Sequence, residues 1–236
     1  MKNQFGQKVG DIVDDWKSRS MPIFKEMNGR FCTLLPLDIN QHAELLFKAF
    51  QFGNQGEIYT YLPFGPFTTY DSFKEWLQNA CLSKLFFTIC DLKNNTFQGI
   101  ASFHDIDIEH GVIEVGSVLY SKALQKTAAG TEAMYLMMRE VFEVLGYRRY
   151  QWRCNALNLA SRRAAERLGF TYEGIFRQHY VFKGRNRDTA WYSLIDTEWP
   201  ALKNKFEQWL SSNNFDEHGN QIMKLDNIAK CYTSGT

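Results

Sequence analysis

The sequence has almost no net charge and no long apolar run. Its 27 Lys and Arg residues nearly match its 26 Asp and Glu residues, which leaves a formal charge of +1 at pH 7. Dedicated nucleic-acid binders carry a strong basic bias, so no nucleic-acid partner is expected. No apolar stretch approaches the roughly 20 residues of a membrane helix, and the polar N-terminus lacks the apolar stretch of a secretory signal. We therefore expect a cytoplasmic protein without a membrane partner.

The few cysteines and histidines lack the spacing of a metal site. There are five cysteines, an odd number with no C-x-x-C pair, which argues against a disulfide framework and against a cysteine-rich zinc site. The five histidines form no H-E-x-x-H motif. We expect reduced thiols and no metal cofactor.

Apolar and aromatic residues are plentiful enough for one substantial core. Hydrophobic residues make up 44% of the chain and aromatic residues 15%, a composition that disfavours intrinsic disorder. No internal repeat, low-complexity segment or linker divides the chain. We expect a single domain over residues 1–212, with an extended or irregular lead-in over 1–27 and the core at about 30–200. A polar, disordered tail is expected at 213–236.

The first half of the chain predicts two helices and an antiparallel meander. Apolar residues at helical spacing indicate helices over 39–50 and 69–82, and the Gly-rich, aromatic segment 51–67 between them indicates a loop. Strand-like runs lie at residues 30–38, 84–92, 97–107 and 111–120. Because short polar breaks of the hairpin type separate the last three runs, we expect these strands to pair antiparallel.

The second half predicts a β-α-β unit. A mostly apolar helix over 129–146 is followed by a strand over 148–156 in which polar and apolar residues alternate. We expect the strand before this helix and the strand after it to be parallel, with a right-handed connection. The remaining elements are expected to be a helix that ends at Gly169, strands over 170–184 and 187–199, and a helix over 200–212.

Three sequence motifs lie at the ends of these elements. The strand at 111–120 ends in VGSVLYS, and the segment QKTAAGT (125–131) leads into the next helix. Small residues there let the backbone approach a phosphate, and free N–H groups at the start of a helix can bind it. The third motif, CNALNLASRRAAERLGF (154–170), ends a strand and continues as an amphipathic helix.

Together, in this order and at these separations, the motifs resemble the GCN5-related N-acetyltransferase (GNAT) superfamily. The resemblance covers about residues 30–200 and is greatest to the branch that contains the RimJ and RimL ribosomal-protein acetyltransferases. It implies an α/β fold of the GNAT type, in which an antiparallel meander precedes a parallel β-α-β core and helices cover both faces. It also implies acetyl-CoA as co-substrate and direct transfer of its acetyl group to a primary amine within a ternary complex. The acceptor would be a protein N-terminus or a small-molecule amine, and the protein a monomer or homodimer.

The resemblance assigns cofactor contacts to all three motifs. Residues 125–130 correspond to the family's pyrophosphate loop, with Ala128 at a position where the family usually has glycine. Backbone groups at the end of the 111–120 strand would pair with pantetheine, and Asn158 would contact the pantetheine arm. The implied cofactor-binding residues are Val118, Leu119, Tyr120, Gln125, Lys126, Thr127, Ala128, Ala129, Gly130, Thr131, Asn158, Ser161 and Arg163.

Each of these residues also has an ordinary structural explanation. The strand could be a plain buried strand, and asparagine is a preferred helix N-cap, so Asn158 could serve only to start its helix. Arg162, Arg163 and Arg167 could form a solvated helix face.

Two residues are candidates for the chemistry of transfer. Glu114 corresponds to an acidic residue of RimL-like enzymes and would act as a base, through a water molecule rather than directly. Its alternative is an exposed strand residue. Ser161 would assist the departing thiolate, because the tyrosine that many members place four residues later is Ala165 here. Tyr120 is a possible substitute, and a backbone N–H near Val118 would stabilise the oxyanion.

The loop 51–67 and the turn 183–187 are expected to shape the acceptor site. The aromatic residues Tyr59, Tyr61, Phe64 and Phe67 could line it, although aromatic residues in a loop usually serve packing. A second class of function stays open, in which the domain binds CoA or another ligand without catalysis, as a sensor or an interaction module.

Overall fold

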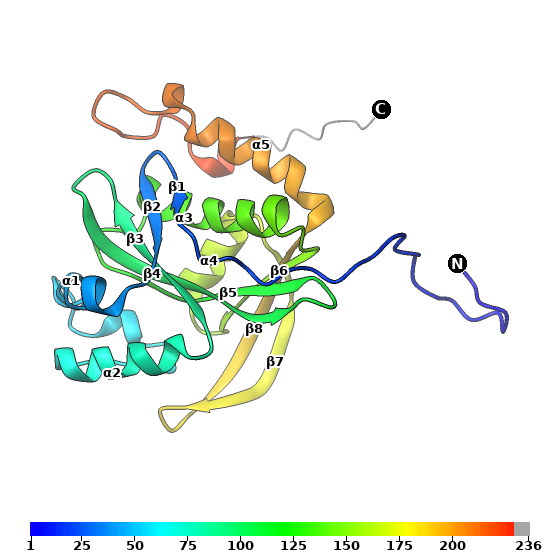
Figure 1. Ribbon diagram of the computed structural model, residues 1–236, viewed down its shortest axis with the longest axis horizontal. Coiled ribbons are helices and arrows are strands. Elements are labelled where there is room, and N and C mark those ends of the chain that lie inside the picture. The colour runs from blue at the N-terminus through cyan, green and yellow to red at the C-terminus, as the bar shows by residue number, and fades with distance from the viewer. Residues whose placement is uncertain (229–236) are drawn as a thin grey trace.

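The computed structural model describes residues 1–228 and contains one mixed sheet of eight strands (Figure 1). The strands are β1 (Met27–Asn28), β2 (Cys32–Pro36), β3 (Leu85–Asp91), β4 (Thr96–Asp107), β5 (Val112–Tyr120), β6 (Arg149–Asn155), β7 (Thr171–Phe182) and β8 (Arg185–Ile195). They lie in the order β1-β2-β3-β4-β5-β6-β8-β7. All neighbouring strands are antiparallel except β5 and β6, which are parallel. The predicted fold class is therefore confirmed.

The α-helices of the described residues cover both faces of this sheet. They are α1 (Ile39–Gln51), α2 (Tyr70–Cys81), α3 (Ala128–Arg139), α4 (Leu159–Arg167) and α5 (Trp199–Leu210). Figure 1 shows α1 and α2 on one side of the sheet and α3 on the other, with α5 stacked over α3. Among residues 1–228, no helix combines the length and the apolar character needed to cross a membrane.

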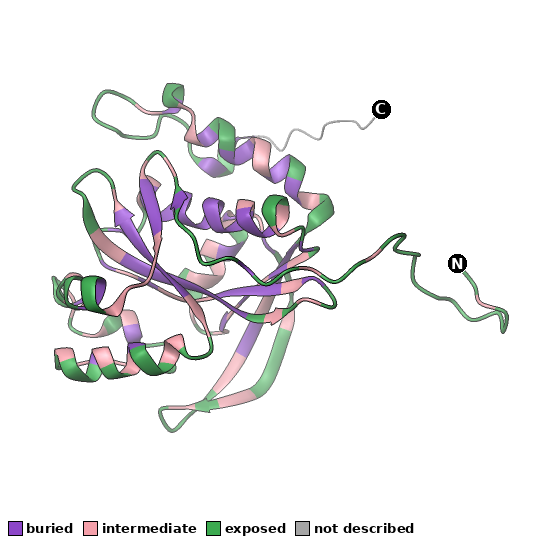
Figure 2. Cartoon of the chain, viewed as in Figure 1, coloured by how far each residue is buried: buried purple, intermediate pink, exposed green. Residues whose placement is uncertain are grey.

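Side chains alternate between the two faces of the sheet along each strand, so the core forms two clusters. One face of β5 and β6 places residues such as Ile113 and Tyr150 against α3, which is buried around most of its girth as predicted. Figure 2 shows this burial on the central strands and on α3. The second cluster lies between the opposite face and α1 and α2, and includes Phe50 and Phe86. The last turn of the predicted 129–146 helix is a π-helical turn, Glu140–Val144.

The N-terminal lead-in is irregular, as predicted, but its second half packs on the domain. The indole Nε1 of Trp16 donates to the carbonyl of Glu109, and the Tyr147 hydroxyl donates to the carbonyl of Ser20. The first residues extend away from the body of the domain (Figure 1).

The C-terminal segment is more ordered than its polar composition predicts. After α5, Asn214 donates to the carbonyls of Trp209 and Met223, which folds the chain back on itself. Leu225 and Ile228 are then buried in the α3-side core. The expectation of a disordered tail is thus wrong up to residue 228, and its remainder, 229–236, lies outside the described residues.

Candidate active site

The parallel strands β5 and β6 separate in the middle of the sheet. Their ladder runs from Val112↔Arg149 to Val115↔Trp152 and then stops, although both strands continue. Beyond this point β5 carries a bulge against β4, and Ser117 has a positive φ of 49°. A bulge bends its strand, so the end of β5, where Val118, Leu119 and Tyr120 lie, has no ladder partner in β6.

The loop after β5 forms a compact helix N-terminus. Thr127 is the N-cap of α3: its Oγ1 accepts from the Gly130 N–H at 3.0 Å and donates to the Leu124 carbonyl at 2.7 Å. The N–H groups of Ala128 and Ala129 lie in the first turn, where a helix offers them no acceptor, and no residue within 1–228 supplies one. These amides are suited to a phosphate. Ala128 is helical, so the glycine usual at this position is not needed for its backbone conformation.

Gly130 is required by close packing under this loop. A Cβ at Gly130 would lie 2.7 Å from the Leu124 carbonyl oxygen and 3.0 Å from the Tyr120 ring. The Tyr120 hydroxyl donates to the Gly130 carbonyl at 2.9 Å, and burial raises the pKa of Tyr120 well above its usual value. Tyr120 therefore has a structural role here, which weakens it as a substitute proton donor.

Asn158 and Ser161 begin α4 beside the end of β6. The Asn158 side chain is the N-cap and accepts from the Ser161 N–H at 3.0 Å, so its ordinary role is present. The Ser161 hydroxyl accepts from the Trp152 indole at 3.1 Å and also hydrogen-bonds the Cys154 thiol. Since Trp152 belongs to the last β5–β6 pair, Ser161 lies next to the point where the strands separate.

The three arginines of α4 have different environments. Arg162 donates from Nε to the Tyr192 hydroxyl at 3.0 Å, and Arg167 donates to Thr131 Oγ1 at 3.2 Å. The expected solvated face is therefore wrong for these two residues, which hold α4 against neighbouring elements. Arg163 is exposed, and among the three its guanidinium is the one left accessible to a CoA phosphate.

Glu114 is buried within a cluster of charged residues. Its side chain lies on β5, directly before the last β5–β6 pair, and the residue is only 1% exposed. Oε1 lies 2.9 Å from Nε of Arg153 and 3.3 Å from Nε2 of His104, and Arg153 also pairs with Asp105. The alternative of an exposed strand residue is wrong. Lys84 completes the cluster by donating to the Ser117 hydroxyl at 2.9 Å.

Burial sets the protonation of this cluster. It raises the pKa of Glu114 to about 8, an effect that Arg153 partly opposes. Burial also lowers the pKa of His104 to about 4, so the imidazole is neutral at pH 7. The pKa of Lys84 is lowered, again mainly by burial. A carboxyl whose pKa lies near the working pH can accept and return a proton.

Sequence reasoning missed His104, Asp105, Arg153 and Lys84 as members of this cluster. His104 and Glu114 are cross-strand partners, and Arg153 faces Glu114 from the parallel neighbour, so their proximity depends on register. Ligand atoms of His104, Asp105 and Glu114 all lie within 4.8 Å of one another. Because Arg153 already binds both carboxylates, the arrangement favours an ion pair over a metal site.

The aromatic loop has a different role from the one predicted. Tyr59 is 2% exposed and packs edge-to-face on Phe67, while Phe64 stacks on Trp76 at 4.1 Å between ring centres. These rings belong to the core cluster under α1 and α2, and of the four predicted substrate residues only Tyr61 is exposed. The loop contacts the β7–β8 turn. The ammonium group of Lys183 donates to the Tyr59 carbonyl at 2.9 Å.

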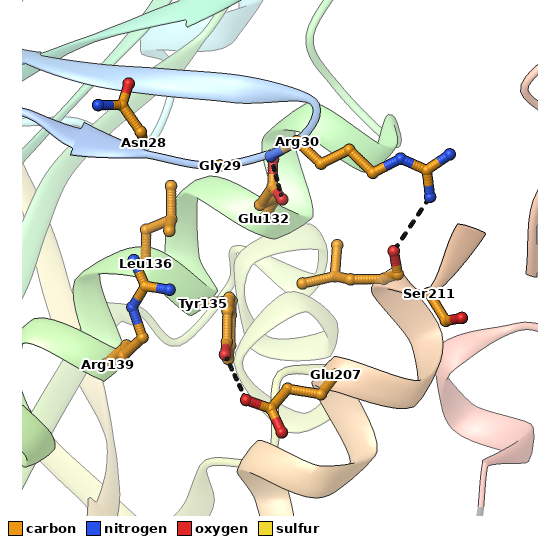
Figure 3. Close-up of a pocket in the computed structure, with 10 residues that line it drawn as sticks. Asn28, Gly29, Arg30, Glu132, Tyr135, Leu136, Arg139, Glu207 and Ser211 are labelled. Carbon is orange, nitrogen blue, oxygen red and sulfur yellow. Dashed lines mark hydrogen bonds between the residues drawn. The ribbon is translucent and has the colours of Figure 1, made fainter.

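A groove of about 330 Å³ lies on the other side of the sheet, between the β1–β2 turn, α3 and α5 (Figure 3). Its polar groups bind one another. Glu132 accepts from three consecutive backbone N–H groups, those of Arg30, Phe31 and Cys32, and Tyr135 donates to Glu207. The groove is therefore a structural contact that joins the N-terminal strands to α3.

Comparison with known proteins identifies the class to which this fold and site belong. A sequence profile of the Acetyltransferase (GNAT) domain matches residues 32–171. The chain therefore belongs to the GNAT acetyltransferase family, which confirms the resemblance seen in the sequence.

Particular relatives agree with this assignment. A GCN5-related N-acetyltransferase from Brucella melitensis is 43% identical, with a TM-score of 0.89 over 92% of this chain and 99% of that one. A probable GNAT acetyltransferase from Chromobacterium violaceum is 36% identical, with a TM-score of 0.76 over 82% of this chain and 98% of that one. The Bacillus subtilis protein YdaF, provisionally named a ribosomal N-acetyltransferase, is 29% identical over 112 residues. That match spans 48% of this chain and 61% of the length of YdaF, and its name agrees with the predicted RimJ/RimL-like branch.

Proposed function

We propose that this protein transfers the acetyl group of acetyl-CoA directly to a primary amine within a ternary complex. The observation that carries the proposal is the position of Glu114. It is a buried carboxyl with a pKa near neutrality, placed directly before the point where β5 leaves β6. In this reaction the amine nitrogen forms a bond to the thioester carbonyl carbon, the carbon–sulfur bond breaks, and the amine loses a proton.

Each residue of the candidate site has a defined part in this reaction. Acetyl-CoA supplies the activated acetyl group, and the first-turn amides at Ala128 and Ala129, with Arg163, are suited to its phosphates. Glu114 takes the proton from the amine through a water molecule. A backbone N–H near Val118 hydrogen-bonds the developing oxyanion. The Ser161 hydroxyl hydrogen-bonds the departing thiolate, which then takes up a proton.

The acceptor is a protein N-terminus or a small-molecule amine. The name of the Bacillus subtilis relative supports a protein acceptor, whereas nothing in the aromatic loop selects one acceptor over the other. An α-amino group titrates near ~8, so a base such as Glu114 can accept its proton without a large mismatch in pKa.

Thermal unfolding with and without acetyl-CoA tests the proposal. At ~100 times its Kd, acetyl-CoA should stabilise the native state by about 2.7 kcal/mol, while ATP at the same concentration serves as the control. A shift with acetyl-CoA alone, followed by release of free CoA thiol when amines are added, is the expected result. No shift at millimolar acetyl-CoA would remove the proposal, and a shift without any acetyl transfer would favour a binding module.

A further inference from the structure

The β7–β8 hairpin contains four buried polar side-chain atoms that form no hydrogen bond with any residue of 1–228. They are Nδ1 of His179, Nε of Arg187, Oγ1 of Thr189 and Nε1 of Trp191. Buried polar groups in folded proteins are nearly always hydrogen-bonded, so a group of unpaired atoms at one place needs an explanation. Four of the ten such atoms in residues 1–228 lie on this one hairpin, where water or a ligand can supply the missing partner.

These atoms lie on the same face of the sheet as the candidate base. Arg187, Thr189 and Trp191 alternate along β8, so their side chains share one face. Trp191 pairs with Arg153 across the β6–β8 ladder, and the Arg153 guanidinium lies 5.2 Å from the centre of the Trp191 ring. Arg153 in turn binds Glu114 at 2.9 Å. Trp191 is thus connected to Glu114 through two direct contacts, and Arg187 and Thr189 lie on the same face of its strand.

The chemistry of the unpartnered atoms restricts what they bind. Nε of an arginine and Nε1 of a tryptophan only donate hydrogen bonds, and the hydroxyl of Thr189 can also donate. Thr189 is fully buried, at 0% exposure. A partner of Arg187 or Trp191 must therefore present hydrogen-bond acceptors, which in a biological amine are most commonly oxygen atoms.

The balance of charge indicates that the partner is an anion. Arg153 is paired with both nearby carboxylates, Asp105 and Glu114. Arg187 forms no ion pair with a residue of the described chain, and its guanidinium instead lies 5.0 Å from the ring centre of Phe182. A planar guanidinium with a free Nε–H is the side chain best suited to a carboxylate.

We propose that Arg187 binds a carboxylate of the acceptor, whose amine then lies toward Glu114. The acceptor is accordingly a small primary amine that carries a carboxylate group. This inference rests on the proposed acetyl transfer and narrows its acceptor.

Matched acceptors test the proposal on the full chain. Amino acids with different spacings between amine and carboxylate are each compared with their carboxamides, which keep the amine and lose the negative charge. The readout is the release of CoA thiol in the presence of acetyl-CoA. The same comparison is made for Arg187→Gln and for Arg185→Gln, a control at an exposed position on the same strand.

The expected result has two parts. The wild-type protein should prefer at least one carboxylate to its carboxamide by about 10- to 100-fold in kcat/KM, the effect of one charge-assisted hydrogen bond or more. Arg187→Gln should abolish this preference through KM, because kcat/KM for the carboxylate falls to that for the carboxamide, and Arg185→Gln should retain it.

Other outcomes overturn the proposal in distinguishable ways. Equal use of carboxylates and carboxamides, or a preference that persists in Arg187→Gln, removes the carboxylate site and leaves the acetyltransferase intact. Acetylation of peptides with a free N-terminus but of no amino acid assigns the site to a protein acceptor. If no amine is acetylated, thermal unfolding with CoA and each amino acid tests the carboxylate site. An amino acid that binds there must still stabilise the wild type more than Arg187→Gln. A protein that acetyl-CoA does not stabilise loses the proposed function itself.

Discussion

His104 and Glu114 face each other across the β4–β5 ladder, with Nε2 of the imidazole 3.3 Å from Oε1 of the carboxyl group. Both are buried, at 8% and 1% exposure. Burial disfavours the charged form of each, so it shifts their pKa values in opposite directions, to about 4 for His104 and about 8 for Glu114. Between about pH 4 and pH 8 both side chains are therefore mainly uncharged, and Glu114 becomes a base as the pH rises through about 8.

Glu114→Gln should lower kcat about 10²- to 10⁴-fold, the usual contribution of a positioned general base. The ionised base is the active form, so wild-type kcat should rise with pH through about 8, the folded pKa of Glu114, and the variant should lose this rise. Stabilisation by acetyl-CoA should be unchanged, because Glu114 is assigned to the proton and not to the cofactor. Steady-state rates of both proteins between pH 6 and 10 measure the pH dependence of kcat.

Glu75→Gln is the matched control, because Glu75 is an exposed carboxylate on α2. A Glu114→Gln enzyme that keeps the pH profile of the wild type, at whatever rate, would show that another group takes the proton.

His104→Gln should make folding stability less sensitive to acid. The folded pKa of His104 is lowered to about 4 from 6.5, so the unfolded chain binds a proton that the folded chain refuses. Wild-type stability is therefore lost as pH falls from 6.5 toward 4, at about 1.4 kcal/mol for each unit of pKa difference. Urea unfolding at pH 7 and at pH 4.5 measures the loss.

The comparison is between the two pH values and not between the two proteins at one pH, since removing the buried imidazole has a cost of its own. His110→Gln, at an exposed histidine on the β4–β5 turn, is the control. An equal acid-induced loss in wild type and His104→Gln would contradict a buried neutral imidazole.

Gly130→Ala should weaken binding of acetyl-CoA and destabilise the fold together. The new Cβ would lie 2.7 Å from the Leu124 carbonyl oxygen, a backbone atom that cannot move without shifting the loop. Overpacking of this kind costs about 1–3 kcal/mol. Thermal unfolding without ligand gives the loss of stability, and the added shift with acetyl-CoA gives the loss of affinity. Gly10→Ala, where a Cβ meets nothing within 4 Å, should change neither quantity.

The course of the chain could be predicted from the sequence, whereas the contents of the site depended on register. The apolar helix between two strands predicted the parallel β5–β6 pair, because such a connection allows one arrangement. The charge cluster could not be predicted in the same way. His104 meets Glu114 because β4 and β5 pair with that offset, and a shift of one residue would place the two side chains on opposite faces of the sheet.

Composition misled in two places for the same reason. The loop 51–67 is rich in glycine, proline and aromatic residues, which is typical of an exposed binding loop, yet Tyr59 is a core residue and Phe67 packs against the same cluster. The arginines of α4 look like a solvated face, yet Arg167 donates to buried Thr131. In both cases another element covers the segment, and one sequence window contains no information about what packs on it.

Ser161→Ala should lower kcat about 10-fold and leave the stabilisation by acetyl-CoA nearly unchanged, because the hydroxyl is assigned to the thiolate that exists only as the reaction proceeds. It should also cost about 1 kcal/mol of stability, since the Trp152 indole loses its acceptor. Ser161→Thr keeps a hydroxyl at this position and separates the two effects. If the hydroxyl acts on the thiolate, threonine should restore much of kcat. If Ser161 serves only to hold Trp152, the rate of each variant should follow its thermal stability, and acetyl transfer by Ser161→Ala at a temperature well below its Tm should match the wild type.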